Sequence, residues 1–515
     1  MPRIVQVWIG FAAMCLGMTL AILDIQIVAS SFTTIEASFG VTPDRLSWIQ
    51  TGYLMAEVIA IPLTGWLTRA LSLRWMFAGA TLGFTLASIA CALCTSLSPF
   101  IALRVVQGFC GGMLIPGVFT SVFVMMPERH RIAATALAGT LAVVAPTIGP
   151  AIGGYLTEMY SWHWIFLINL APGLLVTGVV IGFVRLGTAD LSEFRRIDYV
   201  AISMAALFLA TLELLLKEGP KHDWQGPLVL VCVPICVLAS SGAVWRSLYS
   251  PHPFVELRRF RERTFTLGCA LSFVLGLGLY GSVYLLSLFL GLVRDHSPLE
   301  IGTIMIVSGA AQLLTAPVAA WAETKVDARL LTALGYGLFA AGLVANGFAT
   351  MSTDYDGLFW PQAMRGAAVM LCILPATRLA LESLAPEQVA DGSALFNLMR
   401  NLGGAIGIAL VDTILQQRTP EHAQAIGHRL QAGDADAARL VGLPAQYFHG
   451  HDMGPVDETM RAIAEPLVSK AALAQSFNEA WLTIGVLFAL SLLVLPFMRR
   501  APPATGTMRA PVRPG

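Results

Sequence analysis

The ten residues Ala145-Pro-Thr-Ile-Gly-Pro-Ala-Ile-Gly-Gly154 decide the fold class, because they place prolines and glycines inside an apolar run. The residues that interrupt the apolar pattern recur at spacings of four, and they are Pro146, Gly149, Pro150, Gly153 and Gly154. Each proline removes a backbone hydrogen bond and bends a helix. Glycines on one face let a neighbouring backbone approach closely within a membrane. The stretch favours a bent, closely packed membrane helix that moves, with ordinary packing around a proline kink as the alternative.

The composition around this stretch is that of a membrane protein. Of the 515 residues, 56% are hydrophobic and only 12% are charged, and the mean hydropathy is +0.70. A soluble chain of this length would carry far more polar surface. Apolar runs of about 20 residues, long enough for a hydrocarbon core of about 30 Å, recur along nearly the whole chain. We predict an all-α integral membrane protein with fourteen transmembrane helices in the lipid bilayer.

The distribution of lysine and arginine predicts the orientation in the membrane. With the N-terminus in the cytoplasm, twenty of these residues fall in cytoplasmic segments and four in the short outer loops. Cytoplasmic loops carry an excess of positive charge, so we expect both termini to be cytoplasmic. The apolar run after Arg3 is too long for the apolar core of a signal peptide, and we interpret it as a retained first helix.

A weak internal repeat predicts two halves. The segment Gly65-Trp-Leu-Thr-Arg69 and the segment Ala320-Trp-Ala-Glu-Thr-Lys325 each form a short basic turn, 255 residues apart. Many secondary transporters are built from duplicated halves around a site near the midplane. The predicted division is a six-helix half at 1–190, two inserted helices at 191–250, a second six-helix half at 251–500 with a long outer loop at 417–474, and a cytoplasmic tail at 501–515.

Several functional classes lack their signatures in this chain. No His-Glu-x-x-His, Gly-x-Ser-x-Gly or P-loop motif occurs, so neither an enzyme nor an ATP-driven pump is expected. All eight cysteines fall inside predicted spans, which leaves no zinc-type spacing in a polar segment. His449 and His451 could bind a metal, but solvated histidines are the simpler interpretation. We predict no metal, no bound cofactor and no nucleic-acid partner.

Ionisable residues within membrane spans are costly and are candidates for function. Asp24 in the first span and Arg104 in the fourth are the best pair: a carboxylate that alternates between an arginine and a proton couples helix movement to protonation. A static ion pair is the alternative. Glu57 in the second span is a second protonation site, an attractor for cationic substrates, or a residue of a polar cavity without a role.

Polar and aromatic residues in the spans supply candidates for a substrate cavity, and they are Gln50, Tyr53, Tyr284, Asn397 and Arg400. The cluster formed by Arg400 with Asn397 and Asn401 also fits a role in bracing the thirteenth helix.

At this point the residues resemble a known family. Arg104-Val-Val-Gln-Gly108 and Ala145–Gly154 are similar to two signature motifs of the major facilitator superfamily, the second associated with antiporters. Further segments resemble its fourteen-helix drug:proton antiporter branch, of the EmrB type, and they are Leu23-Asp24, Trp162-His-Trp-Ile-Phe-Leu-Ile-Asn169, His252-Pro-Phe-Val-Glu-Leu257 and Leu395-Phe-Asn-Leu-Met-Arg-Asn-Leu-Gly-Gly404.

The resemblance implies proton-driven export of lipophilic or amphipathic compounds across the bacterial inner membrane. It also implies a periplasmic adaptor and an outer-membrane channel as partners, and the outer loop at 417–474 is the sizeable surface on that side. An uptake transporter of the same superfamily is the alternative. One departure concerns the loop after the second span, where Arg69, Ala70 and Ser72 replace the family pattern and put its usual charge clasp between helices in question.

Overall fold

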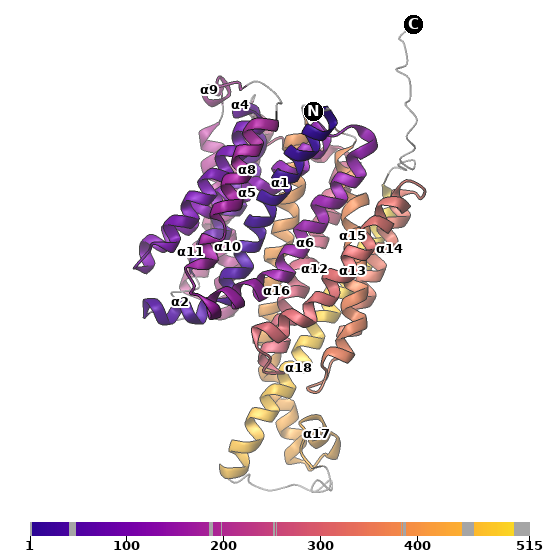
Figure 1. Cartoon of the computed structure of the whole chain (residues 1–515). Helices are drawn as coiled ribbons and strands as arrows, with labels where there is room; N and C mark the ends of the chain where they lie inside the picture. Colours follow the sequence, from indigo (N-terminus) through magenta and orange to yellow (C-terminus); the bar gives the residue numbers. More distant parts are fainter. Residues whose placement is uncertain are drawn as a thin grey trace.

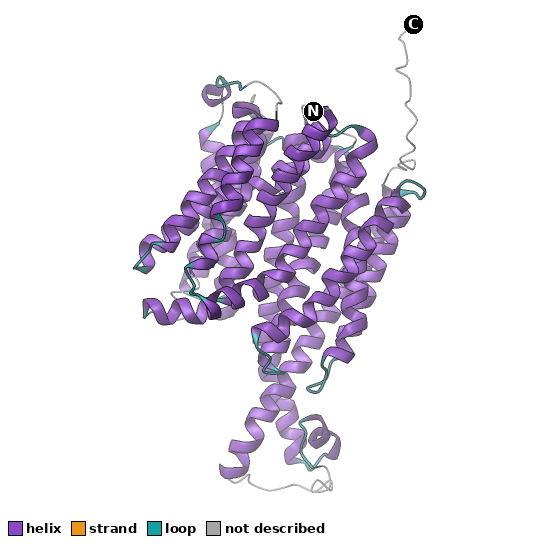
Figure 2. Ribbon diagram, viewed as in Figure 1, coloured by secondary structure: helices purple, strands orange, loops and turns teal. Residues whose placement is uncertain are grey.

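The computed structural model describes residues 3–40, 48–184, 189–196, 198–250, 253, 255–382, 384, 388–444 and 458–498, and within these ranges the chain is helical with short connections and no strand (Figure 2). The helices of the first part are α1 (Arg3–Ser30), α2 (Phe32–Phe39), α4 (Trp48–Ala92), α5 (Leu97–Met125), α6 (Glu128–Met159), α7 (Trp164–Leu167), α8 (Leu170–Phe183), α9 (Glu193–Arg196), α10 (Tyr199–Glu218) and α11 (Pro227–Tyr249).

The helices of the second part are α12 (Arg263–Leu292), α13 (Pro298–Glu323), α14 (Ala328–Asn346), α15 (Tyr355–Leu381), α16 (Val389–Gln431), α17 (Ala435–Leu440) and α18 (Glu458–Ser491). Short 3-10 turns are η1 (Pro220–His222), η2 (Leu257–Arg261) and η5 (Leu492–Phe497).

The all-α membrane architecture predicted from composition is confirmed. Among the described residues, twelve helices are long and apolar enough to cross a membrane. One of them, α4, joins two helices at Ser72, whose φ of 69° and ψ of 156° are not helical. The 32-residue α6 is a further long helix of the bundle, so these helices accommodate the fourteen predicted spans.

The apolar cores follow the two parts of the chain. One cluster of buried side chains comes from residues 11–184, and a second comes from residues 271–498 with Ala136 as its contribution from the first part. A third cluster joins the parts and includes Trp66 of α4, Leu209 of α10 and Phe396 of α16. Of the inserted helices, α10 contacts α4 and α16, whereas α11 packs on α10. The residue boundaries of the predicted domains stay a prediction.

The segment predicted as a long loop at 417–474 is largely helical, which corrects that expectation. The 43 residues of α16 would measure about 65 Å at 1.5 Å per residue, about twice a hydrocarbon core. Accordingly, α16 and α18 run on past the bundle and carry α17 at the far end (Figure 1). An apolar cluster that includes Ile426, Leu430 and Ala471 holds this extension together, and Arg418 pairs with Glu479 across it at 2.6 Å. We call these residues, 417–444 and 458–479, the helical extension.

Candidate functional site

Asp24 lies in α1 at the centre of a buried polar network. Its side chain is 1% exposed, and Arg104 Nη1 of α5 donates to Oδ2 at 2.5 Å. Gln107 Nε2 and Asn169 Nδ2 donate to Oδ1 at 3.1 Å and 3.0 Å. The structure thus places Asp24 and Arg104 in direct contact, and it adds two amide donors that close the carboxylate off from solvent in this conformation.

A second set of groups holds the network in place. Asn169 also donates to Ser88 Oγ at 3.0 Å, and that hydroxyl donates to the carbonyl of Phe166 at 2.9 Å. The guanidinium of Arg104 lies 4.3 Å from the ring centre of Tyr53, a distance at which cations are attracted to aromatic faces. Asp24 of α1 is therefore fixed by groups of α5, by α4 behind them, and by Asn169 in the turn between α7 and α8.

Tyr53, one of the residues predicted for the substrate cavity, is enclosed in this conformation. Its side chain is fully buried, and its hydroxyl donates to the carbonyl of Ala21 at 3.1 Å. Close packing explains this position, because Gly108 leaves no room between α5 and α4: a Cβ there would lie 2.2 Å from the Tyr53 carbonyl oxygen. Tyr53 instead supports Arg104.

Glu57 and Arg400 are buried ionisable residues contributed by the two parts of the chain. Glu57 of α4 interacts electrostatically with Glu213 of α10 and with Arg104. Arg400 of α16 donates to the side-chain oxygen of Asn397, and its guanidinium lies 5.3 Å from the ring centre of Phe119. The hydroxyl of Tyr280 in α12 donates to Asn401 Oδ1 at 3.4 Å, and Glu57 and Arg400 both lie close enough to interact with its phenol electrostatically.

The remaining cavity candidates are separate from this centre. Tyr284 donates to Asp412 Oδ1 at 2.8 Å, which pairs two residues of α12 and α16. Gln50, near the start of α4, is half-buried.

The proline- and glycine-rich stretch lies in α6 and packs directly beside Asp24. A Cβ on Gly149 would lie 2.6 Å from Gln26 Cβ and 3.5 Å from the carbonyl oxygen of Leu23, both in α1. Gly153 is buried and Pro146 is half-buried, whereas a Cβ on Gly154 would meet nothing within 4 Å. The side chain of Pro150 lies outside the described part.

On another face, α6 contacts the second part of the chain. A Cβ on Gly139 would lie 3.2 Å from Ile373 Cγ2 of α15, and Thr140 Oγ1 donates to the sulfur of Met370 at 3.4 Å. The helix that carries the special stretch therefore touches both α1 beside Asp24 and the opposite half of the bundle.

A charge clasp closes the end of the bundle where α1 begins, which corrects the expectation from Arg69, Ala70 and Ser72. Arg69 of α4 donates to both oxygens of Asp391 in α16 and lies 3.7 Å from Glu193 of α9. The missing second glycine does not prevent this contact, because Ser72 itself adopts the positive φ.

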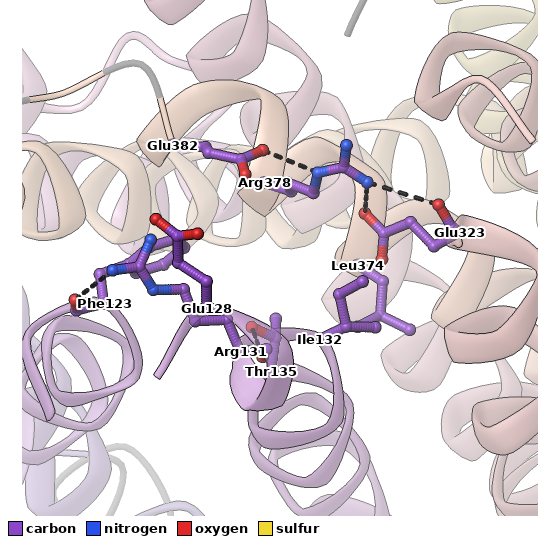
Figure 3. Close-up of a pocket in the computed structure, with 9 residues that line it drawn as sticks. All are labelled: Phe123, Glu128, Arg131, Ile132, Thr135, Glu323, Leu374, Arg378 and Glu382. Carbon is purple, nitrogen blue, oxygen red and sulfur yellow. Dashed lines mark hydrogen bonds and ion pairs between the residues drawn. The ribbon is translucent and has the colours of Figure 1, made fainter. Parts of the chain in front are cut away.

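Charged side chains of both halves border a small pocket between them (Figure 3). Arg378 of α15 pairs with Glu382 at 2.7 Å and with Glu323 of α13 at 3.5 Å, all within the second half. Facing them from α6, Arg131 donates to the carbonyl of Phe123 at 3.1 Å, within the first half.

The clasp gives a testable prediction. Arg69→Asp alone places two carboxylates together at a partly buried contact, where like charges repel each other, so transport is expected to fall by about tenfold. The double variant Arg69→Asp with Asp391→Arg restores opposite charges and is expected to recover part of the activity. Efflux assays in cells measure both. Equal activity of Arg69→Asp and the unaltered chain would contradict a gating clasp.

Sequence reasoning did not identify Gln107, Asn169, Ser88 or Asp391 as site residues. Gln107 belongs to the motif Arg104-Val-Val-Gln-Gly108 and lies three residues after Arg104. That spacing places both side chains on one face of a helix, which could have identified Gln107 as a partner of Arg104. Asp391 gave no signal, because it meets Arg69 only through folding. His449 and His451 lie outside the described residues, and in the part of the chain that the structure describes no group of three or more histidine, cysteine, aspartate or glutamate residues could hold a metal ion.

Comparison with known proteins follows this geometry. The family model of the Major Facilitator Superfamily matches residues 14–408. The chain is 36% identical over 499 residues to the colistin resistance protein EmrB of Acinetobacter baumannii, with 96% of each chain covered. It is 28% identical to the multidrug export protein EmrB of Escherichia coli K12, with 94% of each covered, and 26% identical to the fatty acid resistance protein FarB of Neisseria gonorrhoeae, with 95% of this chain and 94% of that protein covered.

Solved structures support the fold. The crystal structure of the human organic anion transporter MFSD10 superposes with a TM-score of 0.60 at 15% identity, covering 96% of this chain and all of that chain. The proton:xylose symporter XylE superposes with a TM-score of 0.59 at 12% identity, covering 95% of each. At this identity the likeness concerns the fold alone.

Proposed function

Because the chain belongs to the major facilitator superfamily, as an EmrB-type multidrug exporter, we propose that it exports lipophilic or amphipathic compounds in exchange for protons across the bacterial inner membrane. The observation that carries the proton coupling is the fully buried pair of Asp24 and Arg104 beside the Gly149 contact. The names of the relatives refer to multidrug export and to resistance to colistin and fatty acids, and fatty acids are amphipathic.

The coupling works through competition for one carboxylate. When Asp24 is ionised, Arg104, Gln107 and Asn169 hold α1 against α5 and α8. When it is protonated, it loses its attraction for Arg104, and α1 and α6 are free to shift. Because Gly149 joins α6 to α1 and Gly139 joins α6 to α15, such a shift reaches both halves of the bundle.

The clasped end defines the conformation. The positive-inside prediction makes the end with Arg69 and Arg378 cytoplasmic, so the structure corresponds to a state closed toward the cytoplasm. We propose that the centre with Glu57 and Arg400, which is buried in this structure, opens to the outer side in a later step of the cycle. Substrate enters the centre when the clasp opens, and protons enter from outside.

Proteoliposomes with the purified full chain test the proposal. An imposed pH gradient is expected to drive substrate efflux, measured with a panel of lipophilic cations, acids and neutral compounds, and collapse of the gradient with an ionophore is expected to stop it. Accumulation of substrate in the direction of the proton flow would instead support an uptake symporter of the same superfamily.

We also propose that the helical extension docks a periplasmic adaptor that leads to an outer-membrane channel. Its support is that it projects past the bundle on the side opposite the clasp (Figure 1). Deleting residues 430–465 is expected to preserve efflux in proteoliposomes while abolishing adaptor pull-down and resistance in whole cells. Pull-down that survives the deletion would contradict docking.

A further inference from the structure

A second buried arginine, Arg365 of α15, lacks the partner that Arg104 has. Arg365 is 4% exposed, and its Nη1 and Nη2 atoms donate to Ser282 Oγ at 2.7 Å and Ser308 Oγ at 3.3 Å. Its Nε has no hydrogen-bond partner. Among the described residues, no carboxylate forms an ion pair with it, so two neutral hydroxyls are all that compensates its charge.

The comparison with Arg104 shows what is missing. Arg104 lies in the fourth span of the first part of the chain and pairs with Asp24 of the first span. Arg365 lies in the fourth span of the second part, and Ser282 occupies the first span of that part. A serine therefore stands where the other half carries an aspartate. A buried arginine without a counter-charge is costly in a membrane.

The guanidinium opens into a small cavity of mixed character. In this conformation the cavity is narrow, and Ser308 and Gln312 line it together with the apolar side chains of Leu279, Val283 and Val369. One turn before Arg365, Gln362 is 0% exposed, and neither its side-chain oxygen nor its nitrogen has a hydrogen-bond partner. Of these unpaired groups, Arg365 Nε belongs to a residue that lines the cavity, so an unused donor lies beside apolar walls.

We propose that Arg365, Ser282 and Ser308 form an anion subsite that binds the carboxylate of an amphipathic organic acid, with the apolar walls taking the start of its hydrocarbon chain. A planar guanidinium matches a carboxylate in geometry as well as charge. The apolar lining selects an amphiphile over a small inorganic anion. The subsite rests on the proposed export function and names one substrate class for it.

One residue that lines the cavity also contacts the other half of the bundle. Gln312 of α13 donates to the carbonyl of Thr140 in α6 at 3.5 Å. The helix that packs beside Asp24 is therefore also in contact with the wall of the anion subsite.

The test measures binding to the full chain in nanodiscs of zwitterionic phosphatidylcholine above neutral pH, without a proton gradient. Laurate is the probe, dodecanol is its neutral counterpart and dodecyltrimethylammonium its cationic one. Ser282→Asp supplies an internal carboxylate for Arg365 and is expected to weaken laurate binding by about tenfold or more, since charge-assisted hydrogen bonds are lost to the ligand. Arg365→Gln is expected to do the same. The matched control is Ser287→Asp, which adds the same carboxylate to α12 at a serine whose hydroxyl donates to the carbonyl of Val283 and not to the subsite, and it is expected to keep most of the affinity.

Binding of the cation is expected to be unchanged in all three variants. Laurate binding by Ser282→Asp at the affinity of the unaltered chain would overturn the subsite, as would equal loss of laurate and the cation, or equal affinity for laurate and dodecanol. The binding assay needs no proton gradient, so it tests the subsite separately from the proposed function. If the protein binds laurate but shows no proton-driven efflux in proteoliposomes, the proposed function is rejected and the subsite is retained. If Arg365→Gln does not fold, Ser282→Asp decides.

Discussion

Asp24→Asn is expected to abolish proton-driven efflux while retaining much of the substrate binding. The amide keeps the shape of the carboxylate but does not titrate, so it cannot alternate between Arg104 and a proton. The substitution also leaves a buried arginine without its counter-charge, which costs about 3–5 kcal/mol, and some loss of thermal stability is expected. Efflux driven by a pH gradient in proteoliposomes, with substrate binding measured in detergent, checks the result.

Asp412→Asn is the matched control for this prediction. Asp412 is another aspartate of a membrane helix, but it accepts a hydrogen bond from Tyr284 and has no arginine partner among the described residues. Its amide variant is expected to keep most of the gradient-driven transport. If Asp24→Asn transports at the full proton-driven rate, Asp24 is only a structural ion-pair partner.

Gly149→Ala is expected to arrest alternation between the two states while the protein still inserts in the membrane. The added Cβ would lie 2.6 Å from Gln26 Cβ, so α6 and α1 must separate beside Asp24. Overpacking of this kind costs about 1–3 kcal/mol. If this penalty applies to only one of the two states, it shifts the equilibrium between the inward- and outward-facing states by about 5- to 150-fold. Transport rates and state-specific cysteine labelling report the effect.

The same stretch contains its own control. Gly154→Ala adds an identical methyl group to the same helix, where it meets nothing within 4 Å, and nearly normal transport is expected. Equal impairment by the two substitutions would mean that α6 needs glycine for its flexibility and not for its contact with α1. Normal transport by Gly149→Ala would make the stretch a tolerated kink.

The sequence by itself determined the class and the family, and it predicted fourteen spans where the described residues hold twelve long apolar helices, one of them double. Apolar runs of membrane-spanning length follow from the cost of exposing polar backbone to lipid, and that cost acts on each segment separately. Asp24, Arg104 and Glu57 could be identified as candidate functional residues in the same way, because an ionisable residue inside an apolar run stands out in the sequence even when its partner is unknown. The motif at Ala145–Gly154 was likewise readable along one helix.

Only the tertiary structure decided which charges meet. Asp24 accepts a hydrogen bond from Asn169, 145 residues later in the chain, and Arg69 pairs with Asp391, 322 residues later. No local sequence pattern predicts contacts across such sequence separations. In this conformation Tyr53, a predicted cavity residue, is enclosed and supports Arg104, because Gly108 lets α5 close over it. The polar composition of residues 417–474 predicts a loop. In the structure, an apolar cluster that includes Ile426 and Ala471 joins the helices of this extension. Contacts between distant segments are the part of this protein that spacing along the chain does not encode.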